Sequence, residues 1–413
     1  MIKGLFYLFY HFVVHPLMLT IMIVISPFHK KAKKSLLLRF PKSGMPQWKK
    51  PGYKSTAPIW FHCASGEFEY MKPILRHIKQ QSSNQKIMVS FSSPTYQSSI
   101  ESNPDVDFCF ALPFDFPATI KEMIEFYEPK LLAIARTDIW PEMIRQASSM
   151  KIPSLVFSAT CGKPWSILKR LWDGVVYSYV DQIYCIDEED KQNFIKSGLD
   201  AQKIHVLGDS RFDQAFYRVE SKTTQDLTWL KSETPIMIAG STWPDDEVVL
   251  IPATQELLKY NKIKLIVAPH EPTPKHLQSL TEHLKQYGLN YSLFSESENF
   301  HAQVLIVDQI GILAELYPVA QLAFVGGSFK SKVHSVMEAL VSGCKVCVGP
   351  YYKNNREAIK YQNVESSVTV VNNPEQMTEW IREFRNTKNN IPQKVQSERG
   401  ASEKIAQVIQ SYI

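Results

Sequence analysis

Acidic residues are absent from the first 66 positions of this 413-residue sequence, whereas ten lysines and arginines lie there. Because the whole chain has 46 basic residues, 36 of them remain after this segment, together with all 41 acidic residues. The body of the protein is therefore mildly acidic, which argues against a nucleic-acid-binding protein with a positive face spread over its fold. The basic leader predicts a tethering or steering segment at one end of the chain.

Cysteine is also sparse, and the six cysteines show neither the spacing of a disulfide framework nor that of a zinc site. Cys344 and Cys347 have the spacing of a redox pair, but they fall in a predicted buried strand and not at the start of a helix. We therefore interpret all six as reduced residues of the core, which is typical of a cytoplasmic environment.

The leader contains an apolar run from Gly4 to Phe28, long enough to cross a bilayer at about 1.5 Å of rise per residue. Four lysines in residues 30–34 follow this run, which argues against a cleaved signal peptide and would keep the downstream chain in the cytoplasm. His11, His15 and Pro16 interrupt the run, so a helix lying in the membrane interface is the alternative. Either arrangement places the rest of the chain at a cytoplasmic membrane surface rich in anionic lipid.

Beyond the leader, short apolar runs alternate with amphipathic stretches of helical period, a pattern that predicts parallel sheets with helices on both faces. The runs of the first series are Ile59 to Cys63, Ile87 to Phe91, Phe108 to Leu112, Leu131 to Ala135, Ser154 to Phe157, Ile183 to Ile186 and Ile204 to Leu207. Those of the second series are Ile236 to Ala239, Lys264 to Ala268, Val304 to Val307, Ala323 to Val325, Lys345 to Val348 and Val368 to Val371.

These series predict an α/β protein with two Rossmann-like domains, whose ligand would bind in a cleft outside the carboxyl ends of both sheets. The expected divisions are a membrane anchor with its basic flank (1–34), a first domain (35–215), an interdomain connection (216–234), a second domain (235–388) and a C-terminal helix (389–413).

One corner of the first series is a candidate for chemistry. The apolar run that begins at Ile59 stops at Ser65-Gly66-Glu67, and a helical pattern follows at once. Ligands of α/β proteins bind beyond the carboxyl ends of strands, so Glu67, the first acidic residue of the chain, is a candidate catalytic carboxylate. The alternative is that Glu67 only complements the dipole of the following helix.

Strand ends of the second series offer polar groups as well. Ser241 and Thr242 precede a predicted helix, where they would act as N-caps or as phosphate contacts. Pro269 and His270 end the next run, and a histidine so placed can donate to a phosphate or a base. Without a phosphate, His270 would be an ordinary loop histidine.

The paired glycines Gly326 and Gly327, followed by Ser328, permit a close approach of the backbone to a ligand. They do not form a P-loop, because no Gly-Lys-Ser/Thr follows at the required spacing. A helix predicted just beyond would carry His334 and Glu338 on one face. A metal site is one interpretation but lacks a third ligand nearby, whereas a helix N-terminus facing a nucleotide phosphate needs no metal.

The order of these motifs resembles the 3-deoxy-D-manno-octulosonic acid (Kdo) transferases of lipopolysaccharide synthesis, membrane-anchored enzymes of the GT-B fold. The motifs that carry the resemblance are Trp60 to Glu67, Asp138 to Pro141, Gly208 to Asp213, Ser241-Thr242, Asp308 with Gly311, Tyr317 to Ser328, His334 to Glu338 and Gly349-Pro350.

The resemblance implies an inverting transfer of Kdo from CMP-Kdo to a lipid A precursor at the cytoplasmic face of the inner membrane, without metal or cofactor. It implies that Glu67 is the catalytic base. Ser65, Gly66, Arg136 and Asp138 would lie near the acceptor or the donor carboxylate. The nucleotide-sugar would be held by Ser241, Thr242, Pro269, His270, Gly311, Gly326, Gly327, Ser328, His334, Ser335 and Glu338.

The sequence also departs from the family pattern. Arg136-Thr137-Asp138 replaces the usual Glu-Thr-Glu, and Thr160 stands where the family has an arginine. Arg136 would restore the charge lost at Thr160. Other interpretations are a related transferase with a different donor or acceptor, a nucleotide-sugar epimerase that shares the fold, and an inactive membrane-bound scaffold.

Overall fold

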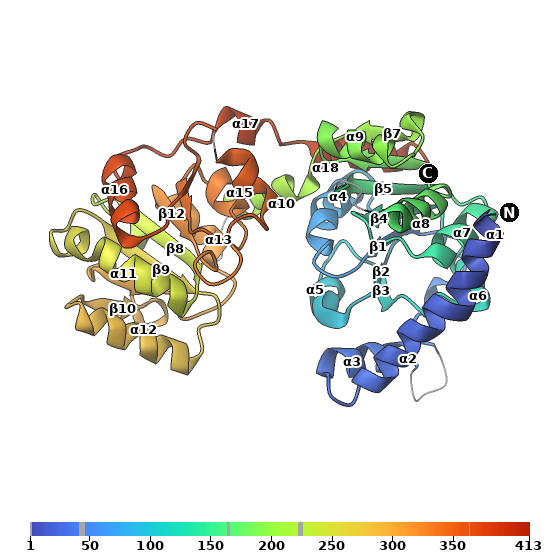
Figure 1. Ribbon diagram of the computed structural model, residues 1–413, viewed down its shortest axis with the longest axis horizontal. Helices are drawn as coiled ribbons and strands as arrows, with labels where there is room; N and C mark the ends of the chain where they lie inside the picture. Colours follow the sequence, from blue (N-terminus) through green and yellow to red (C-terminus); the bar gives the residue numbers. More distant parts are fainter. Residues whose placement is uncertain (1, 41–45, 163–165, 222–225, 363) are drawn as a thin grey trace. The chain divides into compact units, whose positions relative to one another are not determined.

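Two parallel sheets of seven strands form the centres of two separate units of the chain in the computed structural model (Figure 1). The structure describes residues 2–40, 46–162, 166–221, 226–362 and 364–413. Unit 1 comprises Met1–Gln214 and Gly400–Ile413, and unit 2 comprises Ala215–Arg399. Residues 222–225 of the predicted connection, and Lys42 of the basic leader, lie outside the described residues. The prediction of two α/β halves with parallel sheets is confirmed.

The sheet of unit 1 has the strand order β3-β2-β1-β4-β5-β6-β7. Its strands are β1 (Ile59–Cys63), β2 (Ile87–Phe91), β3 (Phe108–Ala111), β4 (Leu131–Ala135), β5 (Ser154–Ala159), β6 (Gln182–Cys185) and β7 (Ile204–Val206). Successive side chains of a strand point to opposite faces of the sheet, so Trp60 packs into one apolar cluster, whereas Ile59 and Phe61 pack into another. Helices cover both clusters, which explains why the central strands are continuous apolar runs.

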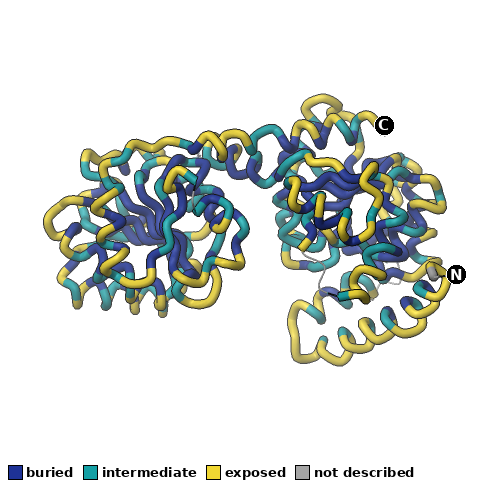
Figure 2. Tube along the Cα trace, turned by 45° about the horizontal axis from the view of Figure 1, so that its top comes forward, coloured by how far each residue is buried: buried dark blue, intermediate teal, exposed yellow. Residues whose placement is uncertain are grey.

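The leader packs against unit 1 through one of its sides. It consists of α1 (Ile2–Phe9), a π-helical turn (Tyr10–Val14), α2 (His15–Ile25) and α3 (Lys30–Arg39). The Tyr10 hydroxyl donates to Asp115 Oδ2 at 2.8 Å, and the Tyr7 hydroxyl donates to the carbonyl of Pro141 at 2.9 Å. Many residues of the leader are exposed, as the yellow stretches of Figure 2 show, and most of their large side chains are apolar. Lys3–Ile25 is long and apolar enough to cross a membrane by length and composition.

Among the described residues, seven further α-helices belong wholly to unit 1, and α10 begins there and ends in unit 2. They are α4 (Phe68–Gln81), α5 (Gln97–Glu101), α6 (Pro117–Tyr127), α7 (Pro141–Ser149), α8 (Ile167–Tyr177), α9 (Glu188–Lys196), α18 (Ala401–Gln410) and α10 (Ser210–Glu220). The C-terminal helix α18 packs on α4, with Ile405 and Ile409 in the apolar cluster of that face. Asp213 fixes its N-terminus by accepting hydrogen bonds from the backbone N–H groups of Gly400 and Ser402, both at 2.7 Å.

The sheet of unit 2 has the order β10-β11-β9-β8-β12-β13-β14 and is parallel throughout. Its strands are β8 (Ile236–Thr242), β9 (Lys264–Pro269), β10 (Tyr291–Leu293), β11 (Val304–Ile306), β12 (Leu322–Val325), β13 (Lys345–Val348) and β14 (Val368–Val370). Its helices are α11 (Pro244–Lys259), α12 (Pro274–Gln286), α13 (Leu313–Leu316), α14 (Met337–Val341), α15 (Arg356–Tyr361), α16 (Pro374–Phe384) and α17 (Gln393–Gln396). The short edge strand β10 was not predicted from the sequence.

All six cysteines are free thiols, and five of them are buried. Burial raises the pKa of the Cys344 thiol to about 12, which disfavours the thiolate needed for redox exchange. Cys347 lies in β13 and is fully buried. Five of the six cysteines therefore lie in the core as predicted, and Cys109 is half-buried.

Candidate active site

The predicted catalytic carboxylate lies at the carboxyl edge of the unit 1 sheet, directly after β1. Glu67 is the N-cap residue of α4, and its Oε2 accepts a hydrogen bond from the backbone N–H of Ser65 at 2.8 Å. Its side chain is half-buried, and a Cβ placed on Gly66 would lie 3.5 Å from the ring of Tyr96. This carboxylate lies both at a helix N-terminus and at the ligand-binding edge of the sheet.

Asp138, which follows β4, is held by hydrogen bonds that connect three strand ends. Its Oδ2 lies 3.1 Å from Nε2 of the fully buried His62 and accepts a hydrogen bond from the Ser92 hydroxyl at 2.7 Å. The indole N–H of Trp140 donates to Ser92 Oγ at 3.0 Å. Burial alone would raise the pKa of Asp138, but these hydrogen bonds, that from His62 above all, lower it. Asp138 is therefore a fixed anion at neutral pH.

Arg136 occupies the end of β4 in a left-handed conformation, with φ of 64°. Its Nη1 donates to the Tyr70 hydroxyl at 2.5 Å and its Nη2 to the Thr160 hydroxyl at 2.9 Å. Tyr70 lies in the first turn of α4, so Arg136 contacts the helix that begins after Glu67. The structure thus brings the predicted residues of unit 1 to one edge of its sheet, namely Ser65, Gly66, Glu67, Arg136 and Asp138.

A pocket of about 210 Å³ in unit 2 gathers four of the predicted nucleotide-sugar residues. The pocket is lined by Arg218, Ser241, Gly311, Leu313, Ala314, Tyr317, Ser335 and Glu338. The Ser335 hydroxyl donates to Glu338 Oε2 at 2.8 Å, and Arg218 Nη1 lies 3.5 Å from Glu338 Oε1. A carboxylate, a guanidinium and a hydroxyl therefore converge on one space.

His270 and His334 form an aromatic stack at the carboxyl ends of β9 and β12. Their ring centroids are 4.1 Å apart, and the indole N–H of Trp243 donates to His334 Nε2 at 3.2 Å. Burial, with the neighbouring positive groups, lowers the pKa of His334 to about 4. His334 is therefore neutral at pH 7 and, since Nε2 accepts a hydrogen bond, it carries its proton on Nδ1.

Gly326 and Gly327 lie close against the backbone of neighbouring segments of unit 2. A Cβ on Gly326 would lie 2.4 Å from the carbonyl oxygen of Ser241, and one on Gly327 would lie 2.3 Å from that of Lys332. Buried Asp246 holds the loop, because its carboxylate accepts hydrogen bonds from the backbone N–H groups of Gly327 at 2.7 Å and Phe329 at 2.9 Å. Protein packing alone therefore explains why these positions require glycine.

The predicted helix that carries His334 and Glu338 on one face is wrong in part, since α14 begins only at Met337. The residues before it are held by asparagine side chains: Asn355 Nδ2 donates to the carbonyl of His334 at 2.9 Å, and Asn354 Nδ2 to that of Val333 at 2.9 Å. His334 and Ser335 lie in a segment without regular secondary structure, and Glu338 lies in the first turn of α14.

The remaining predicted residues of unit 2 have mixed surroundings. Trp243 is the N-cap of α11, so capping by Ser241 or Thr242 is ruled out. The Thr242 hydroxyl is buried and donates to Glu247 Oε1 at 2.8 Å. The buried Ser328 hydroxyl donates to the carbonyl of Val325, and Pro269 is a buried residue at the end of β9. Of this group, Ser241 alone lines the pocket described above.

Within the described ranges, no group of three or more His, Cys, Asp or Glu side chains is arranged to hold a metal ion. The sequence analysis did not identify Arg218 and Tyr317, which line the unit 2 pocket, or Asp246, which holds the glycine loop, as individual site residues. Arg218 lies in an amphipathic helix far along the chain from the pocket loops, and no local pattern marks it. Ser92 follows β2 at the same edge as Glu67, and the strand-end rule would have found it.

Comparisons with known proteins agree with the sheet topology and the motifs. A family model described as 3-deoxy-D-manno-octulosonic-acid transferase (kdotransferase) matches residues 37–214. The 3-deoxy-D-manno-octulosonic acid transferase of Chlamydophila psittaci is 30% identical over 345 residues, which cover 80% of this chain and 76% of that protein. The corresponding transferase of Aquifex aeolicus is 26% identical over 340 residues, covering 81% of this chain and 87% of that protein.

A solved structure, UDP-GlcNAc 2-epimerase from Methanocaldococcus jannaschii, superposes with a TM-score of 0.61 at 13% identity and covers 86% of this chain and 99% of that one. At this identity the likeness concerns the fold alone, and it confirms the expected GT-B architecture of two Rossmann-like units. The identity and coverage of the transferase relatives decide the family. The chain belongs to the 3-deoxy-D-manno-octulosonic acid transferases, a family of glycosyltransferases.

Proposed function

We propose that this protein transfers Kdo from CMP-Kdo to a lipid A precursor, with inversion at the anomeric carbon. In this reaction a hydroxyl oxygen of the acceptor attacks the anomeric carbon of Kdo, the bond from that carbon to the CMP phosphate oxygen breaks, and CMP leaves on the opposite side. The acceptor hydroxyl gives its proton to a base. The observation that carries the proposal is the Glu67 carboxylate at the ligand-binding edge of a sheet in a chain of this family.

Glu67 is the proposed base. Its carboxylate is oriented by the backbone N–H of Ser65, which bonds one oxygen at 2.8 Å. Precise placement of this carboxylate against the acceptor hydroxyl would make it effective as a base. Arg136, at the same sheet edge, supplies a positive charge for an anionic group of the substrate.

Unit 2 is proposed to bind the donor. In its pocket, Glu338 would accept hydrogen bonds from ribose hydroxyls, and Arg218 would pair with the phosphate. His270 and His334 would contact the leaving phosphate. The proposed chemistry uses neither a metal ion nor a cofactor.

The proposed location is the cytoplasmic face of the inner membrane, with the leader lying in the interface. Tyr7, Tyr10 and His11 all bond to unit 1, whereas Leu5, Phe12 and other apolar side chains of the leader are exposed. A leader crossing the bilayer would carry those polar partners into the hydrocarbon region, where burial of polar groups is costly. The lysines of α3 would attract anionic head groups.

The test is transfer of labelled Kdo from CMP-Kdo to purified lipid A precursor by the native chain and by Glu67→Gln. General base catalysis contributes about 10²–10⁴-fold, so the variant should lose activity by a factor of that order. Glu69→Gln is the matched control, because Glu69 lies in the first turn of the same helix and pairs with Lys72 at 2.7 Å. It should keep nearly full activity.

Three outcomes would each reject a part of this proposal. If the native chain binds CMP-Kdo but transfers nothing, the scaffold interpretation replaces the enzyme. If it transfers a different sugar, or uses a different acceptor, the chain is a related transferase. Equal activity of native protein and Glu67→Gln would reject only the role of Glu67.

A further inference from the structure

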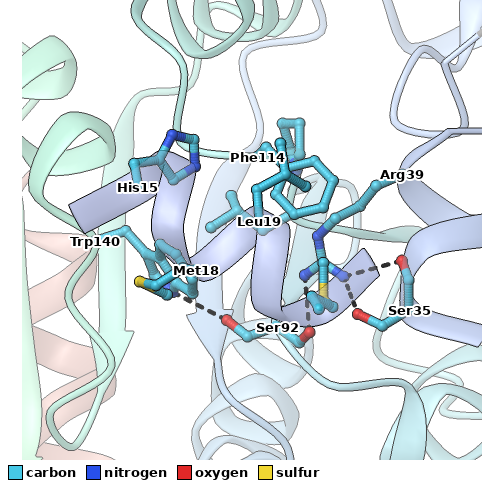
Figure 3. Close-up of a pocket in the computed structure, with 11 residues that line it drawn as sticks. His15, Met18, Leu19, Ser35, Arg39, Ser92, Phe114 and Trp140 are labelled. Carbon is cyan, nitrogen blue, oxygen red and sulfur yellow. Dashed lines mark hydrogen bonds between the residues drawn. The ribbon is translucent and has the colours of Figure 1, made fainter. Parts of the chain in front are cut away.

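An apolar groove runs between the leader and the sheet edge of unit 1, and the family assignment gives it no role. One part is a cavity of about 110 Å³ whose apolar lining includes Met18, Leu19, Met22, Phe114 and Trp140 (Figure 3). A second, more open part of about 540 Å³ shares Met18 and Met22 with the first and continues along α2 and α3. The two parts form one groove within a single unit.

The inner end of the groove reaches the loop of the proposed base. Ser92 lines both parts, and its backbone N–H donates to the carbonyl of Cys63 at 3.1 Å. The N–H of Ser93 donates to the carbonyl of Ala64 at 2.8 Å. Residues 92 and 93 therefore lie directly beside the segment that leads into Ser65 and Glu67. A molecule in the groove would have its polar end next to that carboxylate.

The polar end of the groove is fixed and carries positive charge. Arg39 Nη2 donates to the carbonyl of Ser92 at 2.7 Å, and its Nη1 donates to the carbonyl of Ser35 at 3.2 Å. Figure 3 shows this guanidinium between Ser35 and Ser92, with Phe114 beside its side chain. These bonds fasten α3 to the end of β2, so the groove is a built feature and not a gap beside a loose helix.

The outer end opens among basic and apolar groups. His29 and Lys31 line it, and three further lysines lie on α3. Ile21 and Ile25 continue the apolar lining towards the exposed side of the leader. A ligand that fits this arrangement has a hydrocarbon chain for the groove and an anionic head group for Arg39 at its inner end, whereas the lysines at the outer end would face the head groups of the membrane.

We propose that the groove between α2, α3 and the end of β2 binds one acyl chain of the acceptor glycolipid and thereby positions the acceptor hydroxyl beside Glu67. This inference rests on the proposed function for the identity of the acceptor. The leader then has two roles: its exposed side binds the membrane, and its groove binds an acyl chain that comes out of the membrane. Bulk phospholipid in the groove is the competing occupant, which the experiment separates.

The first measurement compares two acceptors, the acylated lipid A precursor and its fully deacylated, water-soluble form. Met22→Trp, which fills the groove, should raise KM for the acylated acceptor about tenfold, the factor expected when roughly two methylene groups lose their contacts. Its kcat/KM for the deacylated acceptor should be unchanged, which also demonstrates that the variant is folded. Ile23→Trp is the matched control: Ile23 is the next residue, is 51% exposed and lines neither part of the groove.

The second measurement does not depend on transfer. The full-length Glu67→Gln protein is placed in phospholipid nanodiscs without CMP-Kdo and titrated with acceptor lipid that is brominated on its acyl chains. Bromine quenches tryptophan fluorescence. The quenching of Trp140 is obtained by subtracting the quenching measured in the same protein with Trp140→Phe. Saturable quenching by the brominated acceptor, abolished in Met22→Trp, supports the proposal even if no transfer is ever detected. Equal quenching by brominated phospholipid, or an equal effect of Met22→Trp on both acceptors, would overturn it.

Discussion

Arg136 donates a hydrogen bond from Nη2 to the hydroxyl of Thr160 at 2.9 Å, so two of the positions at which the family resemblance led us to expect other residues are in direct contact. The arginine expected at position 160 is replaced by a threonine that binds an arginine from the neighbouring strand end. The guanidinium therefore remains at this edge of the sheet, although it comes from β4 and not from β5.

This exchange of positions predicts unequal effects of two substitutions. Arg136→Ala removes the charge and should lower kcat/KM for Kdo transfer by about 10–100-fold, in line with roughly 1.5–3 kcal/mol for a hydrogen bond to a charged group. Thr160→Ala leaves the guanidinium bound to Tyr70 and should cost less than about fivefold. Steady-state kinetics of both variants decide the question. Equal losses would mean that the Arg136–Thr160 contact, and not the charge, is what matters.

Most of the sheet strands could be predicted because buried parallel strands are continuous apolar runs, as in β1, β4 and β9. The strand β10 could not, since Tyr291–Leu293 is a three-residue edge strand whose side chains are only half-buried. Edge strands bury less apolar surface, so their sequences carry a weaker signal.

Some features of the candidate site could be predicted from the sequence, and others could not. Glu67 could be found because strand-to-helix corners are marked locally in the sequence. The start of α14 could not be placed, because the carbonyls of Val333 and His334 are held by Asn354 and Asn355, some 20 positions later. Arg218 could not be predicted either, because its contact with Glu338 joins positions far apart in the chain and no local sequence pattern indicates it.

The loop at Gly326 gives a second prediction. An added Cβ would meet the backbone of Ser241 and Thr242 at 2.4 and 2.7 Å, and backbone cannot move aside as a flexible side chain can. Gly326→Ala should therefore lower the free energy of unfolding by about 1–3 kcal/mol and weaken CMP binding to the adjacent pocket. Gly174→Ala is the control, because a Cβ there meets nothing within 4 Å and the residue lies inside α8. Urea denaturation followed by circular dichroism measures both.

A third prediction concerns how the stability of the protein depends on pH through the His276–Glu247 pair, which also contacts Thr242. His276 Nε2 lies 3.0 Å from Glu247 Oε1, the same oxygen that accepts the Thr242 hydroxyl, and the hydrogen bond to Glu247 raises the pKa of His276 above its usual value. A raised folded pKa means that this pair stabilises the protein fully below the unfolded value of about 6.5. That stabilisation is lost as the pH rises through the folded pKa.

Melting temperatures of the native protein and His276→Gln, measured from pH 5.5 to 9, test the sign of this effect. The variant should melt lower at pH 5.5, and the difference should shrink as the pH rises. His283→Gln, on the same helix, is the control, and its difference from the native protein should not vary with pH in this way. A difference that grows with pH would contradict the assignment.

The docking of the leader depends on Asp115, which gives the last prediction. Its Oδ2 accepts hydrogen bonds from the Tyr10 hydroxyl at 2.8 Å and the Glu142 N–H at 2.7 Å, and its Oδ1 accepts one from the Met143 N–H at 2.9 Å. Asp115→Asn replaces one accepting oxygen by a donor, which leaves a buried N–H or the hydroxyl unpaired at a cost of about 1–3 kcal/mol. Backbone amides of α1 and α2 should then exchange with deuterium about 10-fold or more faster in detergent micelles.

Two variants of the leader itself distinguish loss of the hydrogen bond between Tyr10 and Asp115 from a general loss of the leader's packing. Tyr10→Phe removes one hydrogen bond and should accelerate exchange less than Asp115→Asn, because no backbone N–H loses its partner. His15→Phe should not accelerate exchange, since neither ring nitrogen of buried His15 has a hydrogen-bond partner among the described residues and an apolar ring removes that desolvation cost. Native-like exchange in Asp115→Asn would show that the apolar contacts of the leader, such as that between Phe6 and Trp172, suffice to hold it on unit 1.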